Sequence, residues 1–251
     1  MSVEIISLLL LIGFIGGVLN AVAGGSSLIT FPALMAVGFP PIVANATNFM
    51  GLIASNAAAL PAYRHELREV IPKIVPLLIL SGIGGLAGAL LLLVSDPQVF
   101  IALIPFLILF ATLMFAFGDR VKAWLDRVQG GYVLGLTILF LASIYGGYFG
   151  AGLGIILLAV VQIFGFRDYN RANAIKNLLG TYFSIISIIV FGFGGLIDWP
   201  AATVMVVGST IGGYSGGIIA KRFDNTTLRK ALIVYGLLLS GIYFLRNLGA
   251  F

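Results

Sequence analysis

The side chains that could take part in chemistry are amides, hydroxyls and one lysine, and they gather around two glycine-rich segments. The first segment contains Gly24, Gly25, Ser26 and Ser27, and the second contains Gly150 and Gly152. A helix that starts at such a segment presents unpaired N–H groups and the positive end of its dipole. Glycine lets a ligand approach that backbone closely, so both segments are candidate sites for a small anion. Tight helix packing is the alternative use of the same glycines.

Further polar residues follow or flank the two glycine segments. Asn45, Thr47 and Asn48 follow the first, Asn173, Lys176 and Asn177 follow the second, and Asn20, Tyr145 and Tyr148 flank them. Asn45 aligns with Asn173, and Asn48 aligns with Lys176, without a gap. We include all of these residues as candidate substrate-binding residues. For Asn20 and the two tyrosines, interfacial or packing roles fit equally well.

Other kinds of reactive group are missing from the apolar stretches. The nine acids fall in predicted loops or near the chain end, which disfavours a proton relay or an acid-lined cation site. The chain has no cysteine and one histidine, His65, predicted on a charged surface loop. An intramembrane protease would need paired Asp, Ser–His or a metal site. We therefore expect no metal, no cofactor and no enzymatic activity.

The composition indicates a membrane protein. Apolar residues make up 60% of the chain and charged residues 9%, and the mean hydropathy is +1.13. A soluble domain carries roughly a quarter charged residues. The apolar runs recur far beyond the N-terminus, which excludes a signal peptide on a soluble body. The net charge of +5 is explained by membrane topology, so we expect no nucleic-acid partner.

Lys176 is unusual among the basic residues because it lies more than one helical turn beyond Arg171. A lysine at the bilayer centre costs roughly 2.5–3.5 kcal/mol on insertion scales. If it faces a cavity, its ammonium group is a natural counter-charge for an anion. If it does not, its stem snorkels to the cytoplasmic interface. The sequence leaves both interpretations open.

The elements that must position these residues are apolar stretches separated by breakers. They cover 3–37, 42–62, 72–94, 98–118, 131–165, 170–193, 199–220 and 229–247. One span needs about 20 residues, so the first and fifth stretches are too long, and each is interrupted by a glycine segment. The matching order predicts an N-terminal repeat at 1–118, a hydrophilic cytoplasmic linker at 119–130 and a C-terminal repeat at 131–251.

The distribution of Lys and Arg predicts how the repeats are threaded. If every stretch crossed once, seven basic residues would lie on each side of the membrane. If 3–37 and 131–165 enter and return on one side, thirteen lie on that side and only Arg246 lies opposite. The positive-inside rule favours the second threading. The fold class predicted is an all-α membrane protein of two inverted repeats, each a re-entrant, glycine-broken helical hairpin followed by three transmembrane helices.

Four motifs carry a resemblance to a known family. They are GVLNAVAGGSSLITFP at 17–32, GFPPIVANATN at 38–48, YGGYFGAGLG at 145–154 and RANAIKN at 171–177. The chain resembles the sulfite exporter TauE/SafE family, also called the toluene-sulfonate uptake permease family. It departs from the family pattern at Ser26 and Ser27, where glycines are usual, and at Ile175, where threonine is usual. The resemblance implies transport of sulfite, thiosulfate or organosulfonates.

The function predicted is secondary transport of a small sulfur-containing anion, by alternating access around the two hairpin tips near the midplane. An anion channel that uses the same site is the alternative, followed by a structural membrane protein. We expect a multi-pass protein of the cell (plasma or inner) membrane with both termini extracytoplasmic. Its expected partners are the anionic substrate and the lipid bilayer. The oligomeric state stays open, a homo-oligomer included.

Overall fold

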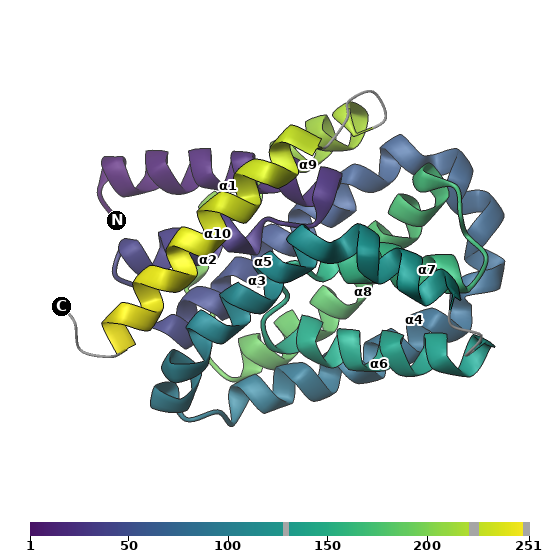
Figure 1. Ribbon diagram of the computed structural model, residues 1–251. Coiled ribbons are helices and arrows are strands. Elements are labelled where there is room, and N and C mark those ends of the chain that lie inside the picture. The colour runs from purple at the N-terminus through teal and green to yellow at the C-terminus, as the bar shows by residue number, and fades with distance from the viewer. Residues whose placement is uncertain (128–130, 221–225, 248–251) are drawn as a thin grey trace.

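The described part of the protein is all helical. The computed structural model describes residues 1–127, 131–220 and 226–247 (Figure 1). Ten α-helices and one 3-10 turn cover these residues. They are α1 (Val3–Ala23), α2 (Ser27–Ala36), α3 (Pro41–Ala59), η1 (Leu60–Tyr63), α4 (Arg64–Leu93), α5 (Pro97–Arg127), α6 (Gly131–Tyr148), α7 (Leu153–Ile163), α8 (Tyr169–Phe193), α9 (Trp199–Ile219) and α10 (Thr226–Asn247).

Several helix starts follow from local sequence. Asp168 caps α8 by accepting a hydrogen bond from the Arg171 amide at 2.9 Å, and Asp198 caps α9 through the Ala201 amide at the same distance. Such caps satisfy one of the N–H groups that a helix start leaves unpaired. Proline at the first position of α3 and of α5 fits a helix start because its missing N–H is not needed there.

The two glycine segments interrupt the helices where the sequence indicates. The N–H of Gly24, a residue with φ of +73°, donates to the carbonyls of Asn20 and Leu19 and ends α1. Gly150, with φ of +77°, ends α6 in the same way by donating to the Tyr145 carbonyl. The helices that follow are short: α2 has 10 residues and α7 has 11. At 1.5 Å per residue they measure roughly 15 to 17 Å, about half of a bilayer core.

The most extensive helix contacts match when α1–α5 are exchanged with α6–α10, whereas the contact between α5 and α7 has no counterpart of similar extent between α10 and α2. Helix α1 packs along α9, and α6 packs along α4; α3 packs on α9, and α8 packs on α4. The pairs α3–α8 and α5–α10 map onto themselves. In Figure 1, α1 and α2 lie on the side of the chain ends, and α6 and α7 lie on the other side.

The distribution of side chains is that of a membrane protein. Six stretches are long and apolar enough to cross a bilayer: Val3–Val22, Pro41–Leu93, Pro97–Val121, Gly131–Tyr148, Tyr169–Phe193 and Trp199–Ile219. Large apolar side chains point outward along these helices, for example Ile83, Phe106 and Ile189. Asparagines, serines and one lysine lie in the interior instead. Polar groups therefore face a protected centre and apolar groups face the surroundings.

Some predicted boundaries were wrong because charged residues extend the helices beyond the apolar stretches. Helix α4 begins at Arg64, so His65, Glu66 and Glu69 lie in its first turns and not in a loop. Helix α5 continues to Arg127, so most of the predicted linker is helical, and residues 128–130 lie outside the described part. Charged residues suit a helix end that leaves the membrane, because their heads reach water there.

The described acids lie at helix ends or next to them, and four of them are helical rather than in the predicted loops: Glu66, Glu69, Asp119 and Asp126. Glu4 lies in the first turn of α1. Asp119 and Asp126 lie in the last turns of α5. Asp96 precedes α5, and its carboxylate accepts from the Gln98 amide at 2.8 Å. Asp224 lies outside the described residues. No acid of the described chain occupies the middle of a helix.

Candidate functional site

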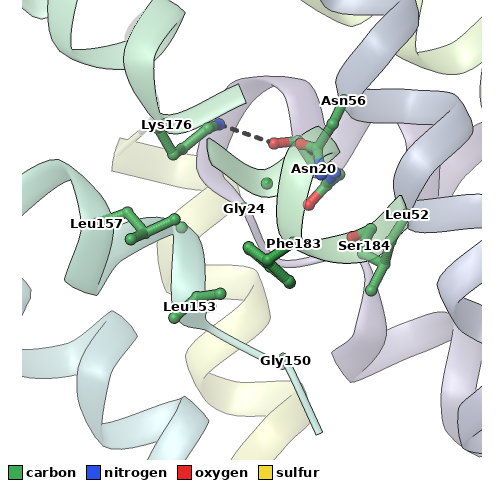
Figure 2. A pocket seen from close by; sticks show the side chains of 12 residues that line it. Asn20, Gly24, Leu52, Asn56, Gly150, Leu153, Leu157, Lys176, Phe183 and Ser184 are labelled. Atoms are coloured by element: carbon green, nitrogen blue, oxygen red, sulfur yellow. Dashed lines mark hydrogen bonds between the residues drawn. The ribbon is translucent and has the colours of Figure 1, made fainter. Parts of the chain in front are cut away.

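A small internal cavity lies where the two glycine breaks meet. Its volume is about 20 Å³, room for one or two water molecules. Figure 2 shows side chains from α1, α3, α7 and α8 converging on it. The lining residues are Asn20, Gly24, Leu52, Asn56, Gly150, Leu153, Gly154, Leu157, Lys176, Gly180, Phe183 and Ser184. Both halves of the chain therefore contribute to one cavity, and four of the predicted site residues are among its lining.

Glycine is needed at the meeting point because the two breaks touch through their backbones. A Cβ built on Gly24 would overlap the Cα of Gly154 and lie 2.9 Å from its nitrogen. The positive φ of Gly24 already disfavours any other residue. The end of α1 thus touches the first turn of α7 at the cavity, where the positive N-terminal dipole end of α7 lies.

Lys176 is the only charged residue in the cavity lining. Its side chain is 2% exposed, so it does not snorkel to an interface. The ammonium Nζ donates to the carbonyls of Asn20 at 3.0 Å and Ala21 at 3.3 Å, at the C-terminal end of α1 (Figure 2). The negative end of the α1 dipole stabilises a cation in this position. An ammonium has three donors, so one remains available toward the cavity.

Neutral amides lie next to Lys176 in the cavity lining. The amide Nδ2 of Asn20 donates to Asn56 Oδ1 at 2.9 Å and to Ser55 Oγ at 2.7 Å. Asn56 lies against α8, because a Cβ on Gly180 would approach Asn56 Nδ2 to 2.7 Å. Both hydrogens of the Asn20 amide are used in these bonds, so Asn56 Nδ2 is the amide donor that remains, and neither side chain carries a negative charge.

Ser184 supplies an unused hydroxyl. The residue is fully buried in the cavity lining, and its Oγ has no hydrogen-bond partner among the described residues. A buried hydroxyl without a partner costs about 1–3 kcal/mol. A ligand in the cavity would recover that cost by accepting its hydrogen.

Replacing Ser184 with alanine is expected to weaken anion binding while raising the stability of the anion-free protein, because it removes a buried hydroxyl without a partner. The loss of one hydrogen bond to an anion predicts a Kd increase of roughly 10-fold. Titration of the purified protein, followed by thermal shift, measures both quantities. Ser187→Ala is the matched control, because that buried hydroxyl already donates to the Phe183 carbonyl at 3.0 Å. Equal effects of the two substitutions on the Kd would remove Ser184 from the site.

The serines of the first break belong to a separate polar cluster. Asn48 Nδ2 donates to Ser27 Oγ at 2.9 Å, and Asn48 Oδ1 accepts from Thr30 Oγ1 at 2.5 Å. Ser26 Oγ lies 3.4 Å from Thr30 Oγ1. These bonds fix the start of α2 on α3, and none of the four residues lines the cavity. Their side chains position the break and do not face a ligand.

Asn45 and Asn173 hold the ends of the two interrupted helices. Asn45 Nδ2 donates to the Tyr148 carbonyl of α6 at 2.8 Å. Asn173 Nδ2 donates to the Ala21 carbonyl of α1 at 3.2 Å and to Tyr63 Oη at 2.7 Å. Each asparagine therefore satisfies a helix-end carbonyl in the opposite half of the chain. In both, the side-chain Oδ1 has no partner among the described residues.

The remaining predicted site residues lie around the cavity without lining it. Thr47 Oγ1 accepts from the Asp198 amide at 3.0 Å, and Asn177 is buried with no partner for its amide among the described residues. Tyr145 donates to the Ala151 carbonyl and packs on Phe110, while Tyr148 packs on Phe100. Gly25 faces Phe115, and Gly152 faces Ala111.

Two polar lining residues were missed from the sequence. Asn56 and Ser184 lie eight residues beyond Asn48 and Lys176, two turns along α3 and α8. Residues seven or eight apart share a helix face. This spacing could have identified both residues from the sequence, because it continues the row of polar side chains along one side of each helix.

The cavity suits a small anion. It combines one cation, the Asn56 amide and Ser184 hydroxyl donors, and the N-terminus of α7, and its lining contains no carboxylate. Within the described chain, no group of three His, Cys, Asp or Glu residues could hold a metal ion.

Comparison with known proteins gives a consistent result. A family model described as "Sulfite exporter TauE/SafE" matches residues 9–244. A "Probable membrane transporter protein" of Haemophilus influenzae is 29% identical over 95% of the chain and 94% of its own length. "Probable membrane transporter protein ORF9" of Sinorhizobium sp. is 28% identical (96% and 92%), and "Probable membrane transporter protein YfcA" of Escherichia coli K12 is 26% identical (94% and 88%). No solved structure matches significantly.

Proposed function

Because this chain belongs to the sulfite exporter TauE/SafE family of membrane transporters, we propose that it is a secondary transporter of a small sulfur-containing anion. The substrate class is sulfite, thiosulfate or an organosulfonate. The observation that supports this proposal most directly is Lys176, a buried cation in a cavity whose lining holds no carboxylate. In a low-dielectric interior, an opposite charge on the ligand compensates such a cation most effectively.

The size of the cavity favours a transporter over a channel. A volume of about 20 Å³ is too small for an oxyanion with several oxygen atoms, and the backbones of Gly24 and Gly154 touch beside it. Larger hollows lie on either side. One of about 220 Å³ is lined by Phe115, Asp119 and Arg229, and one of about 440 Å³ is lined by Ile101, Ile104 and Arg246. They lie toward opposite ends of α5, and equivalent helices of the two halves border them. This arrangement supports alternating access from the two sides.

Inverted repeats explain the threading and the packing together. The positive-inside rule favours a threading in which α1–α2 and α6–α7 each enter and return on one side, because thirteen basic residues then lie on one side and one on the other. The short lengths of α2 and α7 and the exchangeable packing pairs support such hairpins. Both termini are then extracytoplasmic, and the end of α5 with the start of α6 is cytoplasmic.

Single cysteines test this threading directly, because the natural chain has none. Cysteines at Ser2 and Asn247 are expected to react with an impermeant maleimide added outside intact cells. A cysteine at the exposed position Lys73 is expected to react only after the membrane is opened. Labelling of Ser2→Cys only in opened membranes would contradict the proposed orientation.

A substrate screen tests the function itself. Purified protein is expected to be stabilised against heat by at least one of sulfite, thiosulfate, sulfoacetate or taurine, and less by chloride. In proteoliposomes the same anion is expected to show saturable uptake and counterflow. A channel would show neither property. The absence of any anion effect in both assays would reject the substrate class.

A further inference from the structure

The C-terminal ends of α1 and α6 are equivalent positions in the two halves. Gly24 and Gly150 end these helices with nearly the same φ, +73° and +77°. Each glycine N–H donates back to the carbonyl five residues earlier, that of Leu19 or Tyr145. An asparagine from the other half, Asn173 or Asn45, then donates to a carbonyl of the last turn. The negative end of each helix dipole therefore lies in the protein interior.

The two ends differ in one respect, which is charge. At the end of α1, the ammonium of Lys176 lies on the Asn20 and Ala21 carbonyls. The position that aligns with Lys176 in the first half is Asn48, whose side chain is held by Ser27 and Thr30 of α2. Within the described residues, no lysine or arginine makes a hydrogen bond to the end of α6. That helix end has carbonyl oxygens and a negative dipole end without a side-chain cation.

A second observation points to a ligand at the end of α6. Asn45 is fully buried, and its orientation is fixed because Nδ2 donates to the Tyr148 carbonyl. Its Oδ1 therefore faces away from that bond as an acceptor, and it has no donor among the described residues. Asn173 Oδ1 has no donor either, but the carbonyls beside Asn173 already receive the ammonium of Lys176. An acceptor oxygen beside helix-end carbonyls is complemented by a cation.

We propose that the end of α6 binds Na⁺, which takes the place that the ammonium of Lys176 holds at the end of α1. The ligands are Asn45 Oδ1 and the carbonyl oxygens in the last turn of α6, which contains Gly146 and Gly147. Neutral amide and carbonyl oxygens suit a monovalent ion, whereas Ca²⁺ and Mg²⁺ sites are built with carboxylates. Unwound carbonyls and C-terminal ends of broken helices are the usual Na⁺ ligands in transporters with internal repeats.

This site would make Na⁺ the coupling ion, an inference that rests on the proposed transport of an anion. The cavity lies between the two helix ends and contacts both Gly24 and Gly150. An oxyanion there would lie next to Lys176, and the helix end that carries Na⁺ borders the cavity through Gly150. Two positive charges balance a divalent anion, so the loaded protein carries little net charge through the membrane. Each ion then binds more tightly in the presence of the other.

The primary test compares thiosulfate uptake into proteoliposomes in Na⁺, K⁺ or N-methylglucamine media of equal ionic strength. Uptake is expected to be at least 10-fold faster in Na⁺ and to carry ²²Na⁺ inward with the anion. If the screen identifies another anion, the same comparison is made with that anion. Equal uptake in all three media would overturn the Na⁺ site while leaving the proposed function intact.

Two substitutions locate the ion. Asn45→Ala is expected to raise the Na⁺ concentration for half-maximal uptake by about 10-fold or more, whereas Asn173→Ala, the matched change at the other helix end, leaves that concentration unchanged. Equal responses would contradict a site at the end of α6. Asn48→Lys places a lysine at the position equivalent to Lys176, and its uptake is expected to become independent of Na⁺.

A measurement without anion separates the two proposals. Na⁺, compared with K⁺, is expected to raise the melting temperature of the wild-type protein in detergent but not that of Asn45→Ala. This effect survives even if no sulfur anion is transported, in which case only the proposed function fails. No difference between Na⁺ and K⁺ in the wild type would show that water alone satisfies Asn45.

Discussion

Replacement of Lys176 by methionine is expected to lower saturable anion counterflow by roughly 100-fold or more while the protein still inserts. Removing one partner of a buried charge pair costs about 3–5 kcal/mol, and each 1.4 kcal/mol is a factor of ten. Methionine retains most of the apolar stem, so the substitution removes the charge with little change in packing. Counterflow in proteoliposomes at several substrate concentrations measures the loss.

A structural role of Lys176 must be separated from a binding role, because its ammonium also caps α1. Anion-dependent thermal stabilisation serves this purpose: it is expected to disappear in Lys176→Met even where the protein without anion melts at a similar temperature. Lys176→Arg is expected to retain part of the binding. Lys73→Met, on the exposed side of α4, is the control for loss of a lysine. Normal counterflow by Lys176→Met would assign the residue to helix capping alone.

Replacement of Gly24 by alanine is expected to prevent the two breaks from meeting and to lower the yield of folded protein strongly. A left-handed φ costs a non-glycine residue roughly 1–2 kcal/mol. The new Cβ would also collide with the backbone of Gly154, which has no flexible side chain to move aside. Overpacking of this kind costs about 1–3 kcal/mol more. Thermal unfolding in detergent measures the sum.

Gly38 separates the two contributions. Its φ is +104°, yet a Cβ there would meet nothing within 4 Å. Gly38→Ala therefore carries the conformational cost alone and is expected to fold and transport with a modest loss of stability. If Gly24→Ala and Gly38→Ala were destabilised equally, the contact between the breaks would contribute nothing to the fold.

Much of this organisation could be predicted because it depends on local sequence. The breaks at Gly24 and Gly150 need residues that tolerate positive φ, and only glycine supplies this readily. Lys176 could be selected because a lysine beyond a helix start, in an apolar stretch, is expensive unless it has a role. Both features are visible in a window of a few residues.

The direction of each side chain could not be predicted in the same way. Asn45 and Asn48 are three residues apart on α3, yet one turns to the end of α6 and the other to α2. That choice depends on which helix of the other half lies alongside. The sequence suggested Tyr145 as a hydrogen-bond donor to the substrate. In the structure its hydroxyl donates to the Ala151 carbonyl instead, and its ring packs on Phe110. Asn56 entered the cavity only because Gly180 leaves room for it.

The contact between Gly24 and Gly154 has a consequence for how this chain can change over time. The backbone at Gly154 leaves position 24 no room for even one methyl group. A larger residue at position 24 is tolerated only if the opposite half withdraws. Repeats that are free to diverge along their outer helices are therefore constrained at this contact, where a change in the first half depends on the backbone of the second.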